Sequence, residues 1–202
     1  MSTRITAVVG GPAPARARCE QALASLSVDA VGDPAVAPDG LIWFLSSGGV
    51  PDAGTLELLL EARGAESAEL VAGVPVDENG EVVRWLAPTA RSCDTAEMYA
   101  MLARSRMPLM GAGADCLLVP RDLALPAFAG KSGRYGRLAA RVAVGELLAA
   151  HRGVIEPRAR VIIDTLGTER LGVRDVPAGL RAIRAGGAVP RDLLNMFAPG
   201  LR

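Results

Sequence analysis

The chain is poor in the residues that carry much enzyme chemistry. Among its 202 residues are one histidine and three cysteines, and aromatic residues make up only 3%. Cys19, Cys93 and Cys116 are odd in number and widely spaced, which fits neither a metal-binding pattern nor a disulfide framework. Free cysteines are typical of a reducing compartment, so we expect a cytoplasmic protein.

Charge and hydrophobicity argue against two further classes of protein. Lys and Arg number 22, as do Asp and Glu, so the basic excess of a nonspecific nucleic-acid binder is missing. No stretch approaches the ~18 apolar residues of a membrane span, and the apolar run near the N-terminus is too short for a signal peptide. We therefore expect a soluble protein with no transmembrane segment that binds no nucleic acid.

Strand-like and helix-like segments alternate along the chain. An apolar, β-branched run at residues 4–10 predicts a buried strand, and helical spacing follows at residues 14–26. The next strand is Leu41–Leu45, after which Pro51-Asp52 opens a helix that Gly64 is placed to end. Later segments continue the alternation, with strands predicted at 68–76, 81–88, 115–120 and 159–164 and helices at 96–106 and 134–152.

The alternation predicts the fold class. Strands separated by helices are typical of an α/β fold, here with a mostly parallel sheet and flanking helices. One β-hairpin is expected within it, because Asn79-Gly80 lies between two strand-like segments and Asn-Gly readily adopts positive φ. We assign residues 1–164 to this domain and residues 165–202 to a small helical C-terminal extension.

The strand at Leu41–Leu45 ends in "SSGG", and in open α/β sheets ligands bind beyond the carboxyl ends of strands. We predict the principal cleft there, because Gly48 and Gly49 let a ligand approach the backbone closely. A bulky change such as Gly48→Trp should then block ligand binding and leave the fold largely intact. The candidate binding residues are Ser46, Ser47, Gly48, Gly49, Asp52, Gly111, Gly113 and Asp115. A tight strand-to-helix turn, an early-helix acid at Asp52 and turn chemistry at Asp115 explain the same residues without a ligand.

One segment carries a resemblance to a known family. "WFLSSGGVPDAGTLELLLEA" resembles the part of family 2 glycosyltransferases that reads roughly Trp-Phe-Leu-Asp-Asp-Asp-x-x-Pro-Asp before a Leu-rich helix. The segments "ELVAGVPVDENGEVVRW", "PLMGAGADCLLVPRD" and "HRGVIEPRARVIID" follow in the family's order. The resemblance implies a GT-A fold, whose acidic run holds a divalent metal against the donor diphosphate. The family also has a second strand that ends in a base-binding Asp, and a further helix, before this segment. Here only residues 27–40 fill that space, with Asp29 and Asp33 as candidate remnants, so part of the nucleotide cradle is expected to be missing.

The positions that carry the resembled family's metal-binding and catalytic acids hold no carboxylate in this sequence. Ser46, Ser47 and Gly48 stand where the family has three acids, and serine hydroxyls are poor ligands for a hard cation. The family's Glu-Asp pair, which supplies the general base, falls within residues 138–143, where the sequence "LAARVA" holds no acid. We therefore predict no metal site and no cofactor.

Two functions from different classes follow. The first is a glycosyltransferase-like protein that uses a nucleotide-sugar donor, with Arg groups or helix N-termini holding the diphosphate in place of a metal. The second is a non-catalytic binding or assembly protein that keeps the fold. The ligand is a nucleotide sugar or nucleoside diphosphate in the first case, and a protein partner or a second copy of the chain in the second. Whether the protein is an enzyme stays open at this point.

Overall fold

The structure of the protein is a computed structural model that describes residues 3–45, 48–81, 115–135 and 150–163, together with residues 139, 143, 146 and 147. Its strands are β1 (Ile5–Val9), β2 (Asp29–Val31), β3 (Leu41–Leu45), β4 (Val50–Pro51), β5 (Leu70–Val76), β6 (Leu117–Pro120) and β7 (Gly153–Ile162). Its helices are α1 (Ala13–Ser25), α2 (Thr55–Glu66), α4 (Arg121–Phe128), α5 (Lys131–Tyr135) and the short 3-10 helix η1 (Pro34–Val36).

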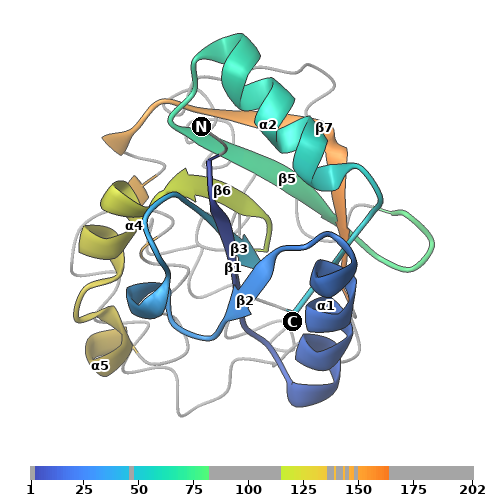
Figure 1. Cartoon of the computed structure of the whole chain (residues 1–202), viewed down its shortest axis with the longest axis horizontal. Helices are drawn as coiled ribbons and strands as arrows, with labels where there is room; N and C mark the ends of the chain where they lie inside the picture. The colour runs from blue at the N-terminus through green and yellow to red at the C-terminus, as the bar shows by residue number, and fades with distance from the viewer. Residues whose placement is uncertain are drawn as a thin grey trace, which may run out of the picture.

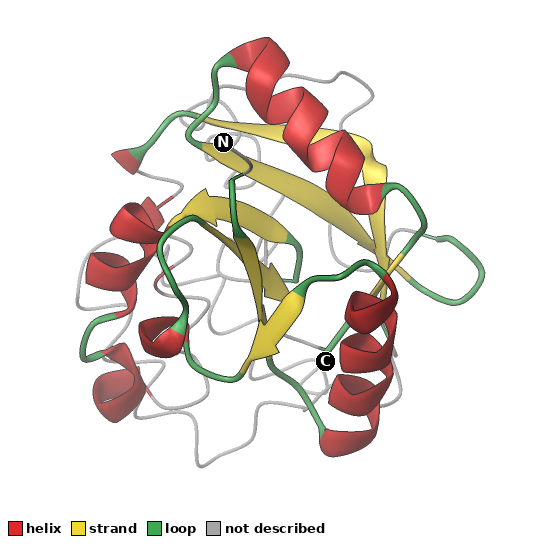
Figure 2. Ribbon diagram, in the orientation of Figure 1, coloured by secondary structure: helices red, strands yellow, loops and turns green. Residues whose placement is uncertain are grey.

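The seven strands form one sheet in the order β2-β1-β3-β6-β5-β7-β4 (Figure 1). The pairings β1–β2, β1–β3 and β5–β7 are parallel, whereas β3–β6, β5–β6 and β4–β7 are antiparallel. The predicted α/β class is confirmed, and Figure 2 shows helices flanking the curled sheet. The prediction of a mostly parallel sheet is wrong, because the sheet is mixed.

Two strands account for the mixed sheet. β6 lies between β3 and β5 and runs against both of them. β4 follows β3 after only residues 46–49 but lies four places from it in the strand order, at the edge of the sheet beside β7. There it pairs antiparallel with the end of β7, which completes the mixed pattern.

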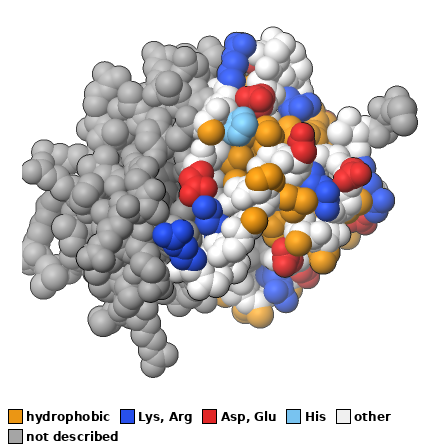
Figure 3. Space-filling view, turned by 90° about the vertical axis from the view of Figure 1, so that its left-hand side faces the viewer, with side chains coloured by type: hydrophobic (Ala, Val, Ile, Leu, Met, Phe, Trp, Pro, Cys, Tyr) orange, Lys and Arg blue, Asp and Glu red, His pale blue; other side chains and the backbone are white. Residues whose placement is uncertain are grey.

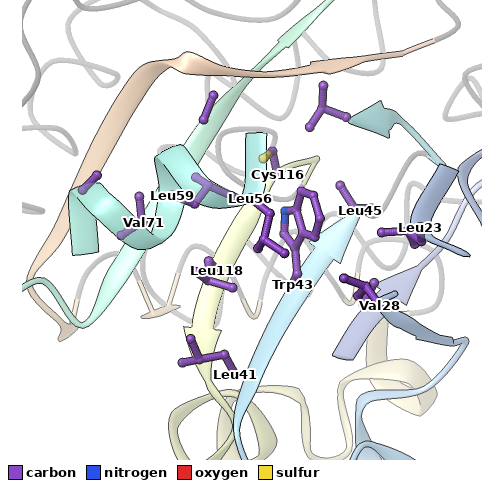
Figure 4. Close-up of a cluster of buried hydrophobic side chains, with 14 of the residues drawn as sticks. Leu23, Val28, Leu41, Trp43, Leu45, Leu56, Leu59, Val71, Cys116 and Leu118 are labelled. Carbon is purple, nitrogen blue, oxygen red and sulfur yellow. The ribbon is translucent and has the colours of Figure 1, made fainter. Parts of the chain in front are cut away.

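β3 is buried on both faces and divides the hydrophobic core into two layers. Trp43 packs with residues of α1 and α2, and Figure 4 shows it near Leu45, Leu56 and Cys116. Phe44 points to the other layer, where its ring stacks on Phe128 of α4 with 4.4 Å between centroids. The apolar character of every residue in β3 thus reflects a strand covered by helices on both sides.

The helix predicted to start at Pro51-Asp52 begins later. Pro51 belongs to β4 and pairs with Val161, and α2 starts at Thr55. The Thr55 hydroxyl donates a hydrogen bond of 2.7 Å to the carbonyl of Arg160, which ties the start of the helix to β7. The Pro-Asp pair is typical of a helix start, but here its proline ends an edge strand, a position that proline also tolerates.

Gly64 does not end α2, contrary to the prediction. The helix continues to Glu66, and Ser67 forms the C-cap in the left-handed conformation, with φ of +49°. The N–H of Ala68 donates to the carbonyl of Arg63 at 3.1 Å, which completes this end of the helix. A serine therefore occupies the left-handed position that glycine usually takes.

The turn at Asn79-Gly80 is confirmed by the backbone. Gly80 has φ of +81°, and its N–H donates to the carbonyl of Asp77 at 3.0 Å. The Asp77 carboxylate accepts hydrogen bonds of 2.9 Å from the N–H groups of Asn79 and Glu81. The second strand of the predicted hairpin, the helix at 96–106 and the C-terminal extension at 165–202 lie outside the described residues.

β7 begins at Gly153, ahead of the strand predicted at 159–164, and contains a wide bulge. Opposite Gly73, the register jumps from Ile155 to Arg160. Within the bulge the fully buried Glu156 carboxylate accepts bonds of 2.9 and 3.0 Å from the Arg158 guanidinium. A proline, Pro157, inside a strand-like run is the sequence signal for such a bulge.

We predict that Gly64→Ala raises the free energy of unfolding by up to about 1 kcal/mol, because alanine is favoured over glycine inside a helix. A Cβ at this position would meet no atom within 4 Å. Urea denaturation followed by circular dichroism measures the change. Ser67→Gly, at the actual C-cap, is also expected to stabilise the protein, because glycine adopts the left-handed conformation without strain. A loss of stability in Gly64→Ala would instead show that the helix ends at Gly64.

We predict that Gly80→Val lowers the free energy of unfolding by about 1 kcal/mol or more, because a β-branched residue resists positive φ. The space around Gly80 is open, since a Cβ would have Arg160 Nη1 as its neighbour at 3.9 Å. Gly80→Asn is the matched control: asparagine tolerates this conformation, so it should lose clearly less. Equal stability of both variants and the unmodified protein in denaturant titrations would contradict the turn.

Candidate functional site

The carboxyl ends of β1 and β3 lie side by side at one edge of the sheet, called here the glycine edge and comprising Gly10, Gly11, Gly48 and Gly49. The carbonyl of Leu45 accepts hydrogen bonds from the N–H groups of both Gly10 and Gly48, at 3.1 and 3.0 Å. The chain leaves β1 through α1 toward β2 on one side, whereas β3 lies on the other side of β1. Such a switch point is where open α/β sheets bind ligands.

The N-terminus of α1 meets the glycine edge. A Cβ on Gly48 would lie 2.9 Å from the nitrogen of Arg16 and 3.0 Å from the carbonyl carbon of Ala15, both in the first turn of α1. No side chain caps this helix end, where Pro12 is the N-cap residue, and the first turn contains no acidic residue. The helix dipole therefore presents partial positive charge at this edge, as sites for phosphate groups often do.

Gly48 and Gly49 are themselves buried rather than open to a cleft. Gly48 has φ of +68° and lies against backbone, so that a Cβ on it would also come within 3.0 Å of the Gly10 oxygen. A Cβ on Gly49 would lie 2.3 Å from Val161 Cγ1 and 2.8 Å from Ile163 Cγ2. The expectation that a bulky residue at Gly48 leaves the fold intact is therefore wrong, because there is no room for it.

Asp115 comes to the same edge as Gly48. It precedes β6, and the antiparallel pairing of Phe44 with Leu117 places the start of β6 beside the end of β3. Its side chain is only 2% exposed, so the carboxylate lies behind the surface of the edge. Of the predicted binding residues, Ser46, Ser47, Gly111 and Gly113 lie outside the described part of the chain.

Asp52 lies farther from the glycine edge. It follows β4, which runs back along β7, and its N–H donates to the carbonyl of Arg160 at 3.1 Å. Its own carbonyl accepts from the N–H of Thr55 at 3.1 Å, so Asp52 forms the turn into α2. Asp52 thus precedes the N-cap residue Gly54 and is not the early-helix acid that the sequence offered as an alternative, since the acid in the first turn of α2 is Glu57.

Neither described cysteine is suited to nucleophilic chemistry. Cys116 follows Asp115, and burial raises the pKa of its thiol to about 12, with a smaller contribution from the Asp115 charge. Burial likewise raises the pKa of Cys19 in α1 to about 12. Both thiols therefore stay protonated near neutral pH, and the thiolate is the reactive form.

The single histidine lies at the opposite end of the sheet. His151 Nδ1 is 3.4 Å from Glu69 Oε2, and Glu69 directly precedes β5, whose start is remote from the glycine edge. Any catalysis at the glycine edge by a histidine paired with serine or cysteine is thus unsupported by this geometry. Among the described residues, no group of three or more His, Cys, Asp or Glu side chains is arranged to hold a metal ion.

The two aspartates considered for base binding make local contacts. Asp29 lies in β2 and forms an exposed ion pair of 2.9 Å with Arg4. The Asp33 carboxylate accepts a bond of 2.8 Å from the N–H of Ala35 and so caps η1. The short strand β2 itself, which the sequence pattern did not predict, completes the sheet beside β1.

The described surface has no large patch of one charge on the face seen in Figure 3, where acidic and basic side chains are interspersed. A cavity of about 520 Å³ lies at the opposite end of the sheet from the glycine edge, between the end of α2 and the start of α4. Sequence reasoning missed this cavity because α4 was not predicted. None of the helices in the described part of the chain combines the length and apolar character needed to cross a bilayer.

Comparison of the whole sequence with models of protein families finds no match, and no curated protein matches it either. The assignment of the candidate site therefore rests on its own geometry.

We predict that Gly48→Ala destabilises the protein more than Gly54→Ala. Both glycines have positive φ, +68° and +81°, so alanine strains the backbone at either position, by about 1–2 kcal/mol. A Cβ at Gly54 would meet nothing within 4 Å, whereas at Gly48 it would press on the first turn of α1. The difference between the two variants in denaturant titrations measures the close approach, and equal losses would show that α1 does not pack on Gly48.

Proposed function

We propose that the chain is a glycosyltransferase-like protein that binds a nucleoside diphosphate or nucleotide sugar at the glycine edge without a divalent metal ion. The observation that carries the proposal is the switch point between β1 and β3, where the uncapped N-terminus of α1 meets Gly48. This combination of strand ends and a helix N-terminus suits a diphosphate. The resemblance of residues 43–62 to family 2 glycosyltransferases adds support from the sequence.

The diphosphate would be held by the N–H groups of Ala13 and Ala15 in the first turn of α1 and by a nearby guanidinium, since Pro14 has no N–H and the Arg16 N–H donates to the Pro12 carbonyl. Arg16 lies in this turn, and its ion pair with Glu20 is 3.4 Å long between side chains that are about half exposed. Exposed i,i+4 pairs contribute only ~0.3–0.5 kcal/mol, so Arg16 can turn to a phosphate at little cost. Arginine and N–H groups would then supply the charge stabilisation that a metal supplies in the resembled family.

Binding is better supported than sugar transfer. A transfer reaction needs a base within hydrogen-bond reach of the acceptor hydroxyl. Asp115 is a carboxylate at the glycine edge, but its side chain is only 2% exposed and so lies behind the surface. Ser46, Ser47 and Gly48 carry no charge at the positions of the family's acids, and the buried Gly48 leaves no space for a carboxylate.

The second candidate is a non-catalytic binding or assembly protein that keeps the fold and takes a protein partner. The burial of Gly48 and Gly49 favours it, because the tip of β3 is filled by α1 and by the end of β7. This function requires no nucleotide, so the two candidates differ in a measurable property.

We expect isothermal titration with uridine diphosphate and guanosine diphosphate to show binding of at least one, with an affinity that manganese leaves unchanged. Ala13→Glu, in the first turn of α1, should weaken that binding about tenfold or more by repelling the phosphates. Ala13→Gln has nearly the same size without the charge and should bind as the unmodified protein does. An acid at this position also favours the helix, so loss of folding is not expected.

Each alternative outcome has a definite meaning. Absence of binding by both nucleotides would overturn the nucleotide proposal and leave the assembly function. A tight site that requires manganese would contradict the prediction of no metal. Equal weakening by Ala13→Glu and Ala13→Gln would show that the ligand does not contact the helix N-terminus through its charge.

A further inference from the structure

The cavity of about 520 Å³ lies between the end of α2 and the start of α4 and is called here the α2–α4 cavity. Its lining residues come from the last turn of α2, the segment before β5, and the junction of β6 with α4: Arg63, Gly64, Ser67, Ala68, Glu69, Pro120, Asp122 and Leu123. Its volume falls within the ~300–1,000 Å³ of small-molecule sites. It is remote from the glycine edge, so it is independent of the proposed function.

Arg63 gives the cavity a cationic group with an unused donor. Its side chain is partly buried, and within the described structure its Nε is enclosed and lacks a hydrogen-bond partner. A buried donor without a partner destabilises a folded protein. A carboxylate that enters the cavity would meet the part of the Arg63 side chain that lines it, whereas the enclosed Nε is out of its direct reach.

Two carboxylates line the same cavity. Glu69 Oε2 accepts a bond of 3.0 Å from the N–H of Arg152 and lies 3.4 Å from His151 Nδ1, so this oxygen is oriented by two neighbours and Oε1 is the one left for a ligand. Asp122 is exposed, and its Oδ1 accepts a bond of 3.1 Å from the N–H of the adjacent Leu123. An ionised carboxylate has about four acceptor sites, so both groups retain capacity for an ammonium donor. The negative end of the α2 dipole lies at Ser67 and favours a cation in the same region.

The combination of charges restricts the ligand. A simple anion would be repelled by Glu69 and Asp122, and a simple cation by Arg63. A molecule that carries both charges satisfies both kinds of group. Of the other lining residues, Ala68, Pro120 and Leu123 have apolar side chains that suit a small hydrocarbon body, and Ser67 adds a hydroxyl group.

We propose that the α2–α4 cavity binds a small zwitterion of the free α-amino acid type, with its carboxylate at Arg63 and its ammonium group between Glu69 and Asp122.

Calorimetric titration with L-leucine, N-acetyl-L-leucine and L-leucinamide tests the proposal, because the two derivatives lack the ammonium charge and the carboxylate respectively. We expect L-leucine to bind with a dissociation constant in the millimolar range or tighter, and each derivative to bind about tenfold or more weakly than L-leucine. Failure of L-leucine to bind, or equal binding of all three molecules, would overturn the proposal.

Two variants assign the two charges. Arg63→Gln should abolish the preference for L-leucine over L-leucinamide, and Asp122→Asn should reduce the preference over N-acetyl-L-leucine. Arg4→Gln, an exposed arginine outside the cavity lining, is the matched control and should leave all three affinities unchanged. Unaltered selectivity in both cavity variants would show that L-leucine binds elsewhere. Asp122 is exposed, so its variant remains informative if Arg63→Gln fails to fold.

Discussion

The structure depends on β3 being covered on both faces and paired on both edges. Its five residues bury Trp43 in one core layer and Phe44 in the other, and it pairs with β1 and β6. A strand in this position must end abruptly, because α1 lies against its tip. Gly48 and Gly49 meet that demand, since any side chain there would collide with α1 or with β7. The features that suggest a ligand site in the sequence are therefore also requirements of packing.

A second close approach explains the bulge in β7. Gly73 has no Cβ, and one built there would lie 2.5 Å from both the Ala159 oxygen and Cys116 Sγ. The bulge presses β7 onto β5 at this point, and the buried Glu156 is held in it by the charge-assisted bonds from Arg158. The hydrogen bonds to Glu156, together with its charge, raise the pKa of Arg158, so the guanidinium stays protonated over the ordinary pH range. The buried Glu156 carboxylate thus stabilises the backbone of the bulge, where it also accepts a hydrogen bond of 3.1 Å from the Arg158 N–H.

The sequence predicted what local pattern determines. The apolar run Leu41–Leu45, the first helix and the turn at Gly80 follow from burial, helical spacing and backbone preference, and the structure has all three. The direction of a strand does not follow from such patterns. The strand at β6 was therefore predicted, but its antiparallel direction was not. The end of α2 was misplaced because a left-handed serine replaced the expected glycine. The site was predicted by position, but whether its glycines face a ligand or their neighbours depends on long-range packing.

The two ends of the sheet differ in what holds them together, and this difference bears on function. At the glycine edge Gly48 packs on the backbone of α1 and of Gly10, so backbone dipoles, N–H groups and the half-exposed Arg16 are what the edge offers a ligand. Recognition by such groups suits a phosphate and gives little means of general acid–base chemistry. At the opposite end, side chains of both charges gather around a cavity, where Arg63 has an enclosed Nε with no partner among the described residues. Charged side chains discriminate between ligands more sharply than dipoles do, because a ligand that lacks one charge loses the attraction of one group and keeps the repulsion of the other. Selectivity for a small molecule is therefore a property to expect at the α2–α4 cavity, and tolerant binding of diphosphates at the glycine edge.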